Sequence, residues 1–336
     1  MTYPLDPSLF SDAMKFDPTR AGFGRGLKAA GEANEAVVAL CADLTESTQM
    51  HLFKEAFPKR FIEVGIAEQN LVTVASGMAR AGKIPFTSSY AAFSPGRNWE
   101  QIRTTVTLNN QPVKIVGSHA GIYTGKDGAT HQMLEDIALM RVLPRMVVVA
   151  PGDAIEAEKA TRAIAENGQP SYIRLTREKT PIFSLEESPF EIGKAYVLKE
   201  GADVALMGTG TMTYQLLLAA KILAEQGVNA EVIHVPTIKP LDETTILQSV
   251  KKAGRVITAE EAQIAGGFGS AIAELLSDKL PMPVRRFGVQ DRFGESGDPK
   301  EILTSIGLTG EQMAEAIKMW CDVTPRYHQE RASTAE

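Results

Sequence analysis

Short apolar runs alternate with longer stretches of helical periodicity from about residue 20 onward. Their hydrophobic content predicts buried strands at 36–42, 84–88, 113–117, 146–149 and 172–175. The helical stretch at 153–167 begins at Asp153, whose side chain can cap the first turn of a helix. This alternation favours a largely parallel sheet that is covered by helices on both faces.

One predicted helix has an acidic residue at its start. After Glu68, apolar residues recur at i, i+3, i+4 and i+7, namely Leu71, Val74, Ala75 and Met78. Gly82 then has the position of a glycine that ends a helix. An acid in the first turn of a helix is stabilised by the helix dipole. From the helical pattern alone, this structural explanation of Glu68 is favoured over a catalytic role.

The alternation breaks at 178–194, where prolines and glycine stand among scattered acids, and we predict a linker at 181–194. It then restarts, with strands at 204–207, 230–235 and 256–259 and helices at 214–226 and 268–277. The expected fold class is α/β, with two parallel-type three-layer domains at 1–180 and 195–325, of which the second is smaller. Residues 326–336 are expected to form a polar tail.

Composition limits the classes of partner. The 336 residues include 35 Lys and Arg against 41 Asp and Glu, a net charge of -6, which gives no electrostatic reason to expect nucleic acid or a membrane as a partner. No apolar run approaches a bilayer span, and the N-terminus lacks the layout of a signal peptide. We therefore expect a soluble, cytoplasmic protein in which Cys41 and Cys321 are reduced thiols.

A polar, glycine-rich loop follows the strand predicted at 113–117. It carries His119, Asp127 and His131 at the C-terminal edge of the sheet, where ligands sit in open α/β folds. Binding explains a histidine pair in such a loop better than core packing does. No third metal ligand stands at a suitable spacing, so recognition of substrate hydroxyls and phosphate is favoured over metal binding.

A third segment, 87–93, follows a predicted strand and contains Tyr90 and Phe93. Most aromatic side chains at such positions pack in the core. A flat heterocyclic ligand would also need an aromatic face of this kind.

In their order, spacing and amino-acid sequence, the segments 61–70, 87–93 and 118–132 resemble the pyrimidine-binding region of transketolases and their relatives. The resemblance covers essentially the whole chain from about Thr19 and is greatest to separately encoded C-terminal transketolase subunits. The stretch from His119 to Gln132, continuing to Arg141, carries it most specifically.

The resemblance implies thiamine diphosphate as cofactor. Glu68 matches the carboxylate that hydrogen-bonds N1′ of the cofactor's aminopyrimidine and is therefore a candidate catalytic residue. Tyr90 and Phe93 match the aromatic positions that stack on the pyrimidine, and Asp43 matches an aspartate that lines the same region. The implied activity is transfer of a two-carbon ketol unit between phosphorylated sugars, in which the cofactor acts as the electron sink.

The resemblance also implies the substrate-binding set. His119, Asp127 and His131 match residues that hold the hydroxyls and phosphate of the sugar, and His131 is the second candidate catalytic residue. Arg177 matches a phosphate-binding arginine, whose planar guanidinium suits a phosphate monoester.

The motif that holds the diphosphate in this class of enzyme is absent from the chain. Such enzymes ligate Mg²⁺ (or Ca²⁺) from a Gly-Asp-Gly motif, whereas the sequence offers only Gly-Asp-Pro at 297–299. The resemblance therefore implies an N-terminal subunit that carries the diphosphate and metal site. Because such enzymes resemble symmetric dimers of two-halved chains, we expect an α2β2 assembly.

Other interpretations stay open. The amino-acid sequence at 66–69 and 120–122 is shared with 1-deoxyxylulose-5-phosphate synthases. His119, however, stands where we expect those enzymes to carry arginine. A 2-oxoacid dehydrogenase E1 β subunit is disfavoured by the stretch 127–132. A silent regulatory subunit is disfavoured by the intact set Glu68, His119, Asp127 and His131. The glycines at 208–210 and 266–269 predict turns and helix caps. The resemblance implies a structural and assembly role for the domain that contains them.

Overall fold

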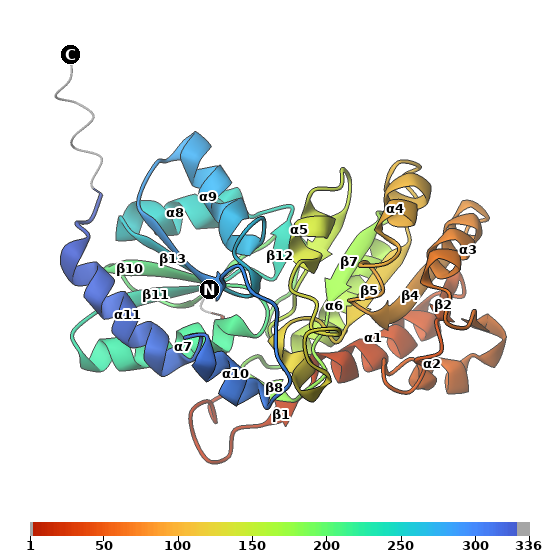
Figure 1. Cartoon of the computed structure of the whole chain (residues 1–336), viewed down its shortest axis with the longest axis horizontal. Helices are drawn as coiled ribbons and strands as arrows, with labels where there is room; N and C mark the ends of the chain where they lie inside the picture. The colour runs from red at the N-terminus through yellow and green to blue at the C-terminus, as the bar shows by residue number, and fades with distance from the viewer. Residues whose placement is uncertain (1–2, 328–336) are drawn as a thin grey trace.

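The computed structural model describes residues 3–327 and forms two α/β domains side by side (Figure 1). The strands of the first part of the chain are β1 (Phe16–Asp17), β2 (Val37–Cys41), β3 (Phe61–Glu63), β4 (Ile84–Tyr90), β5 (Lys114–Ser118), β6 (Val147–Val149), β7 (Ser171–Arg174) and β8 (Thr180–Pro181). Its helices are α1 (Thr19–Ala33), α2 (His51–Ala56), α3 (Glu68–Arg80), α4 (Trp99–Gln101), α5 (Asp136–Arg141) and α6 (Ala154–Glu166). Three tighter or wider helical segments are η1 (Pro58–Arg60), the π-helical η2 (Ile102–Thr107) and η3 (Ile122–Asp127).

The second part of the chain contributes the remaining elements. Its strands are β9 (Tyr196–Lys199), β10 (Val204–Gly208), β11 (Ala230–His234), β12 (Thr237–Lys239), β13 (Val256–Gln263) and β14 (Val284–Val289). Its helices are α7 (Met212–Glu225), α8 (Glu243–Ala253), α9 (Phe268–Lys279), α10 (Pro299–Ser305) and α11 (Gly310–Val323).

The larger sheet has the strand order β12-β6-β7-β5-β4-β2-β3, and every neighbouring pair in it is parallel except β12 with β6. Apolar side chains of α1 and α6 cover one face, and those of α3, η2 and α5 cover the other. Strands β2 and β5, inside the sheet, are buried throughout because both faces are covered, as in other sheets of this type. The three-layer α/β prediction is confirmed.

The smaller sheet has the order β14-β13-β10-β11-β9, in which only β9 runs antiparallel to its neighbour. Helices α7 and α11 pack on one face, and α8 and α9 pack on the other. Strand β12, from this part of the chain, joins the edge of the larger sheet beside β6. One hydrophobic cluster therefore runs from Met140 in the first domain to Ile272 in the second, so the two domains share a core.

The predicted elements are present with boundaries shifted by a few residues, and Asp153 caps α6 by accepting from the Glu156 N–H at 3.0 Å. The segment predicted as a linker is packed rather than free: β8 pairs with β1, and Phe183 is buried. Of the predicted tail, residues 328–336 lie outside the described part of the chain.

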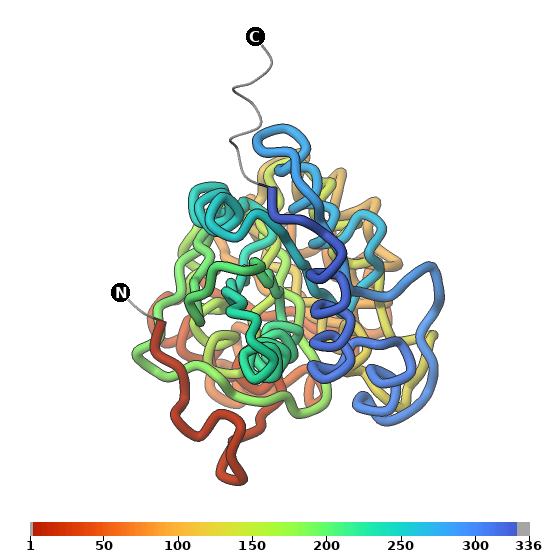
Figure 2. The backbone as a smooth tube through the Cα atoms, turned by 90° about the vertical axis from the view of Figure 1, so that its left-hand side faces the viewer, coloured from red at the N-terminus to blue at the C-terminus, as the bar shows by residue number. Residues whose placement is uncertain are grey.

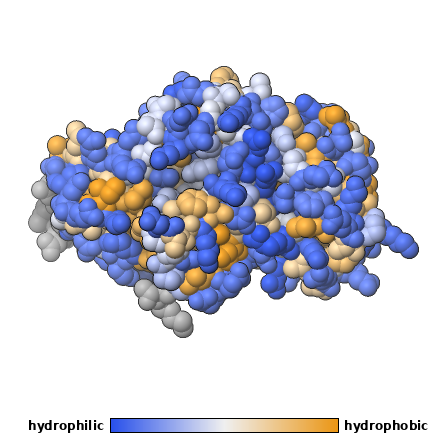
Figure 3. Space-filling view, turned by 90° about the horizontal axis from the view of Figure 1, so that it is seen from below, coloured by the Kyte–Doolittle hydropathy of each residue, from blue (hydrophilic) through white to orange (hydrophobic). Residues whose placement is uncertain are grey.

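The described helices include none that is long and apolar enough to cross a membrane. Seen from below, the surface is mostly hydrophilic with small, separate apolar patches (Figure 3). The same view therefore offers no single broad apolar face.

Candidate active site

The candidate residues lie at the C-terminal ends of neighbouring parallel strands. The strand order β7-β5-β4-β2 brings together the segments that follow each of these strands. These segments contain, in that spatial order, Arg177, His119, Phe93 and Asp43. Parallel pairing thus collects residues that are far apart in sequence at one edge of the sheet.

Glu68 is the first residue of α3, and its side chain is only 2% exposed. Its carboxylate accepts from the Ser89 hydroxyl at 3.1 Å and from Arg97 Nη1 at 2.9 Å. Asn98 donates to the main-chain carbonyl of Glu68 at 2.8 Å, so the first turn of α3 is also held in place. The result is a buried, fixed carboxylate beside the aromatic residues that end β4.

Two aromatic rings and two histidines form one cluster, which we call the ring cluster: Tyr90, Phe93, His119 and His131. Tyr90 stacks on His119 with 3.8 Å between ring centroids and on Phe93 with 6.2 Å. His131 meets Tyr90 and Phe93 edge-on at 5.9 and 5.5 Å. The Arg97 guanidinium lies 4.9 Å from the centre of the Phe93 ring, which connects the ring cluster to Glu68.

His119 is fully buried and has a left-handed backbone with φ of 57°. Its Nδ1 pairs with the Ser118 hydroxyl at 2.9 Å, whereas its buried Nε2 has no hydrogen-bond partner within the described residues. Burial, followed by the positive charges of Arg20 and Arg177, lowers the pKa of His119 to about 2. A neutral imidazole with an unpaired nitrogen therefore faces the site, and such a group calls for a ligand.

Two arginines stand beside this histidine. Arg177 Nη1 donates to the Thr124 carbonyl at 3.2 Å and lies 3.4 Å from Asp127 Oδ1. Arg20, in the first turn of α1, donates to the Ser47 carbonyl at 2.5 Å, and its buried Nε lacks a partner within residues 3–327. Burial and then the charge of Arg177 lower the pKa of Arg20. Two crowded cations with an unused donor are suited to an anionic group.

Asp43 lies at the end of β2 with an exposed side chain and a φ of 58°. Its N–H donates to Glu63 Oε1 at 2.7 Å, and the same carboxylate oxygen accepts from the N–H of Gly65 at 3.0 Å. Glu63 therefore joins the segment after β2 to the segment that leads into Glu68. Asp43 stands one strand away from the ring cluster rather than within it.

No group of three or more His, Cys, Asp and Glu side chains within residues 3–327 is arranged to hold a metal ion. The residues that follow β2, β4, β5 and β7 offer aromatic faces, a carboxylate and guanidinium groups instead. They fit a flat ring and an anion, and they supply no cage for a divalent cation.

Several functional candidates were not predicted from the sequence: Arg20, Ser89 and Arg97. For Arg20 a signal exists, because a cation in the first turn of a helix opposes the helix dipole and suggests a role other than helix stability. Arg97 precedes a short helix and shows no local pattern, so its pairing with Glu68 appears only in the folded chain.

Arg174 lies on β7 between the two domains and is buried. It donates to Asp136 Oδ2 at 2.9 Å and to Glu261 Oε1 at 3.0 Å, from β13 of the second domain. Burial opposes the charge of Arg174, but these two carboxylates outweigh it and raise its pKa. Arg174 therefore joins the two domains and is not part of the candidate site.

The second domain's predicted turns and caps are confirmed, since Gly267 is the N-cap of α9 and Glu260 accepts from the N–H groups of Phe268 and Gly269. His234 is buried and pairs with Thr213 at 2.6 Å and with Glu156 at 2.7 Å.

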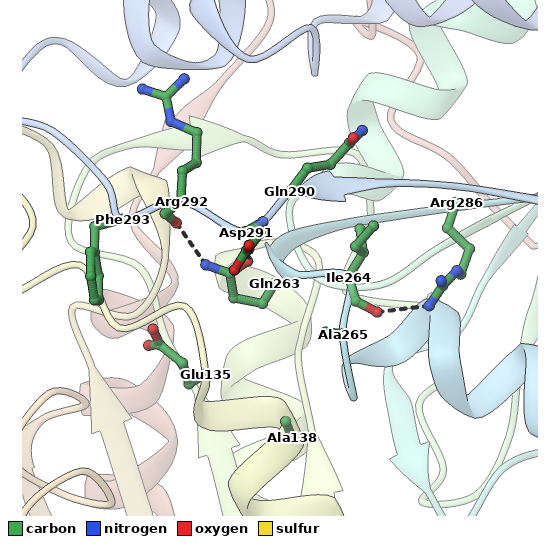
Figure 4. Close-up of a pocket in the computed structure, with 10 residues that line it drawn as sticks. All are labelled: Glu135, Ala138, Gln263, Ile264, Ala265, Arg286, Gln290, Asp291, Arg292 and Phe293. Carbon is green, nitrogen blue, oxygen red and sulfur yellow. Dashed lines mark hydrogen bonds between the residues drawn. The ribbon is translucent and has the colours of Figure 1, made fainter.

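A recess of about 760 Å³ lies away from the ring cluster, between α5 and the second domain (Figure 4). Figure 4 shows Phe293 above Glu135, with Gln263 bonded to the main-chain carbonyl of Arg292. This recess is therefore not the place where the candidate catalytic residues meet.

The fold and the site define a chain that belongs to the transketolase family. Residues 18–182 match the family described as "Transketolase, pyrimidine binding domain", and residues 193–313 match "Transketolase, C-terminal domain". Enzymes of this family generally use thiamine diphosphate and a divalent metal ion.

Within the family the chain is similar to separately encoded C-terminal sections. It is 44% identical to a transketolase C-terminal section of Methanocaldococcus jannaschii over 89% of this chain and 94% of that protein. It is 42% identical to a 6-deoxy-6-sulfo-D-fructose transketolase subunit of Clostridium sp. (strain MSTE9), over 84% of this chain and 88% of that protein. It spans 48% of a 1-deoxy-D-xylulose-5-phosphate synthase of Prochlorococcus marinus, with 37% identity over 88% of this chain.

Solved structures agree. A structure described as "Split gene transketolase, inactive beta4 tetramer" has a TM-score of 0.86 and 42% identity, covering 92% of this chain and 99% of that one. The transketolase of Campylobacter jejuni has a TM-score of 0.77 and 26% identity, covering 91% of this chain and 47% of that one. The chain thus corresponds to the C-terminal half of a full-length transketolase.

Proposed function

We propose that this chain is the C-terminal subunit of a split transketolase, which transfers a two-carbon ketol unit between phosphorylated sugars once an N-terminal subunit completes its active site. The observation that carries the proposal is the buried Glu68 carboxylate, which Arg97 connects to the ring cluster, while Arg20 and Arg177 lie near His119 of the same cluster. An acid, aromatic faces and an anion site are the groups that this reaction needs from this half of the enzyme.

Thiamine diphosphate, when bound, supplies an electron sink for the bond that is broken in the donor sugar. Glu68 would hold a proton at its carboxylate against N1′ of the aminopyrimidine, and Ser89 and Arg97 would keep that carboxylate fixed. Phe93 and Tyr90 would offer the faces against which the ring lies. Asp43 would line the same region from the end of β2.

The substrate would occupy the other side of the ring cluster. Neutral His119 would use its unpaired Nε2 to bind a sugar hydroxyl. His131, whose Nδ1 pairs with the Thr130 hydroxyl at 2.8 Å, would present Nε2 to a second hydroxyl and move a proton there. Arg20 and Arg177 would bind the phosphate, with Asp127 orienting Arg177.

Completion by a partner is supported by two observations. The described residues supply no metal cage, and the similar solved β chain forms an inactive tetramer by itself. The N-terminal subunit would hold the diphosphate with Mg²⁺ (or Ca²⁺). We expect an α2β2 enzyme in solution and a catalytically silent homo-oligomer when this chain is alone.

The test is ketol transfer from xylulose 5-phosphate to ribose 5-phosphate with thiamine diphosphate and Mg²⁺, using this chain, the N-terminal subunit and their mixture. Activity only in the mixture is the expected result. Association of the two chains without transfer between these or other phosphorylated sugars would contradict the proposal.

Two further donors distinguish related activities. The similarity to a 6-deoxy-6-sulfo-D-fructose transketolase subunit favours a parallel assay with that sulfonated ketose, because a sulfonate can use the same arginine pair. The similarity to 1-deoxy-D-xylulose-5-phosphate synthases favours an assay with pyruvate and glyceraldehyde 3-phosphate. A preference for pyruvate would replace ketol transfer by the synthase reaction.

A further inference from the structure

The second domain touches the loop that carries the proposed substrate ligands. We call residues 119–132 the substrate loop and residues 290–297, between β14 and α10, the backing loop. Figures 1 and 2 show the backing loop and α10 in blue beside the chain that follows β5, and the hydrogen bonds between the two loops agree. The contact joins a part of the molecule without candidate catalytic residues to the part that has them.

Gln132 is the central side chain of this contact, and it is only 3% exposed. Its Nε2 donates to the carbonyl of Gly125, within the substrate loop, at 2.9 Å. The same nitrogen donates to the carbonyl of Glu295, in the backing loop, at 2.9 Å. One buried amide therefore closes the substrate loop on itself and ties it to the second domain.

Two more hydrogen bonds tie the loop at separate points. The Ser296 hydroxyl donates to the carbonyl of Lys126 at 2.5 Å. Glu261 Oε2, on β13, accepts from the N–H of Tyr123 at 3.2 Å. The backing loop also needs its glycine, because a Cβ on Gly294 would lie 1.7 Å from Gln132 Oε1.

The ties act on residues next to the proposed substrate ligands. Gln132 follows His131 in the chain, and Lys126 precedes Asp127. The loop also makes backbone hydrogen bonds of its own, such as that from the His131 N–H to the Gly128 carbonyl at 3.0 Å. Gly125 and Gly128, on either side of Asp127, both have positive φ, which glycine leaves readily. A small displacement of binding groups can cost a large factor in rate or affinity, so the external ties have a functional consequence.

We propose that the second domain serves as the backing of the substrate loop and that Gln132 is a positioning residue for His131 and Asp127. The role of this domain is then to hold the sugar-binding residues in place, in addition to assembly. The inference rests on the proposed function, because it takes those residues as sugar ligands.

The test uses the enzyme assembled with its N-terminal subunit. Gln132→Met keeps the length of the side chain and removes both donated hydrogen bonds, and Gln226→Met, on the exposed end of α7, is the matched control. Ser296→Ala removes the second tie at an exposed position, and Ser296→Thr restores the hydroxyl. Each variant is measured for KM and kcat with the phosphorylated donor, for thiamine diphosphate affinity, and for hydrogen exchange of the peptide that covers the substrate loop.

In Gln132→Met we expect KM to rise about tenfold and kcat to fall severalfold, because His131 both binds a hydroxyl and moves a proton, with cofactor affinity within about twofold of the original enzyme and faster exchange in the substrate loop. Ser296→Ala should raise KM about threefold, and Ser296→Thr should reverse this change. Gln226→Met should behave like the original enzyme.

Unchanged KM and unchanged exchange in Gln132→Met would overturn the inference, as would a loss of cofactor affinity in step with KM. If the original assembled enzyme transfers no ketol unit, the proposed function fails instead. Exchange then decides the inference alone: faster exchange of the substrate loop in Gln132→Met supports the backing role, and unchanged exchange overturns it.

Discussion

The Arg97 guanidinium donates to the Glu68 carboxylate across 2.9 Å and joins a side chain that is 51% exposed to one that is 2% exposed. The same guanidinium lies over the Phe93 ring. Arg97 thus contacts two of the groups to which we assign the cofactor's pyrimidine, Glu68 and Phe93. An exposed arginine therefore holds the buried acid on which the proposed chemistry depends.

Replacing Glu68 should remove catalysis and leave the fold intact. Glu68→Gln preserves the shape of the buried side chain but loses the charge and the proton that we place against N1′. We expect ketol transfer by the assembled enzyme to fall by at least about 100-fold, since positioned proton transfer contributes factors of this size. Steady-state assays and a check of subunit association measure this effect. Near-normal turnover would remove Glu68 from the mechanism.

Replacing Arg97 should weaken cofactor binding. Arg97→Met leaves the Glu68 carboxylate held by Ser89 alone, so we expect thiamine diphosphate to bind about five- to tenfold more weakly, about 1 kcal/mol. Titration calorimetry on the assembled enzyme measures the affinity, and Arg103→Met, an exposed arginine one helical segment later, is the control. Tighter binding in Arg97→Met would show that the guanidinium competes with the cofactor.

Arg20 and Arg177 should make the enzyme prefer phosphorylated sugars to uncharged ones. Arg20→Met and Arg177→Met should each raise KM for a phosphorylated donor about tenfold, because each loses a charge-assisted hydrogen bond. KM for an unphosphorylated ketose should change much less. Arg25→Met is the control on the same helix, because Arg25 pairs with Asp17 and Glu158 outside the site. Equal losses for both kinds of donor would contradict a phosphate site.

His119 should make stability fall in acid. Its pKa is lowered from 6.5 in the unfolded chain to about 2 in the folded chain. The stability that this neutral histidine contributes is complete above pH 6.5 and is lost as the pH falls below that value, at about 1.4 kcal/mol per pH unit. His119→Asn, whose residue type accepts the left-handed backbone, should lose about 1.4 kcal/mol less than the original chain between pH 7.5 and 5.5. Urea denaturation at both pH values tests this, and parallel losses would contradict it.

Lys114 should make stability rise with pH in the neutral to alkaline range. Burial lowers its pKa from 10.5 to about 7, although Asn167 accepts from its Nζ at 2.8 Å. Between about pH 7 and 10.5 the unfolded chain binds the extra proton, so the contribution of Lys114 to stability rises with pH across that interval. The free energy of unfolding of the original chain, relative to Lys114→Met, should therefore increase by about 1 to 2 kcal/mol from pH 7.5 to pH 9. A difference that does not change with pH would show that the amine stays charged when buried.

Much of the fold could be predicted from local pattern. The inner parallel strands are buried on both faces, so they appear in the sequence as short apolar runs. The start of α6 could be predicted from Asp153, because a helix cap is a local interaction. Short strands such as β3 and β12 carry too few residues for a period, and β12 exists only because it finds the edge of the other domain's sheet.

The amino-acid sequence by itself determined the two α/β domains, the helix that begins at Glu68, and the loop with His119, Asp127 and His131, because each depends on residues close together in the chain. Only the tertiary structure decided which distant groups meet. Arg97 reaches Glu68 across 29 positions, and Gln132 reaches Glu295 across 163. Such pairs follow from strand order and domain packing, and no local periodicity encodes them.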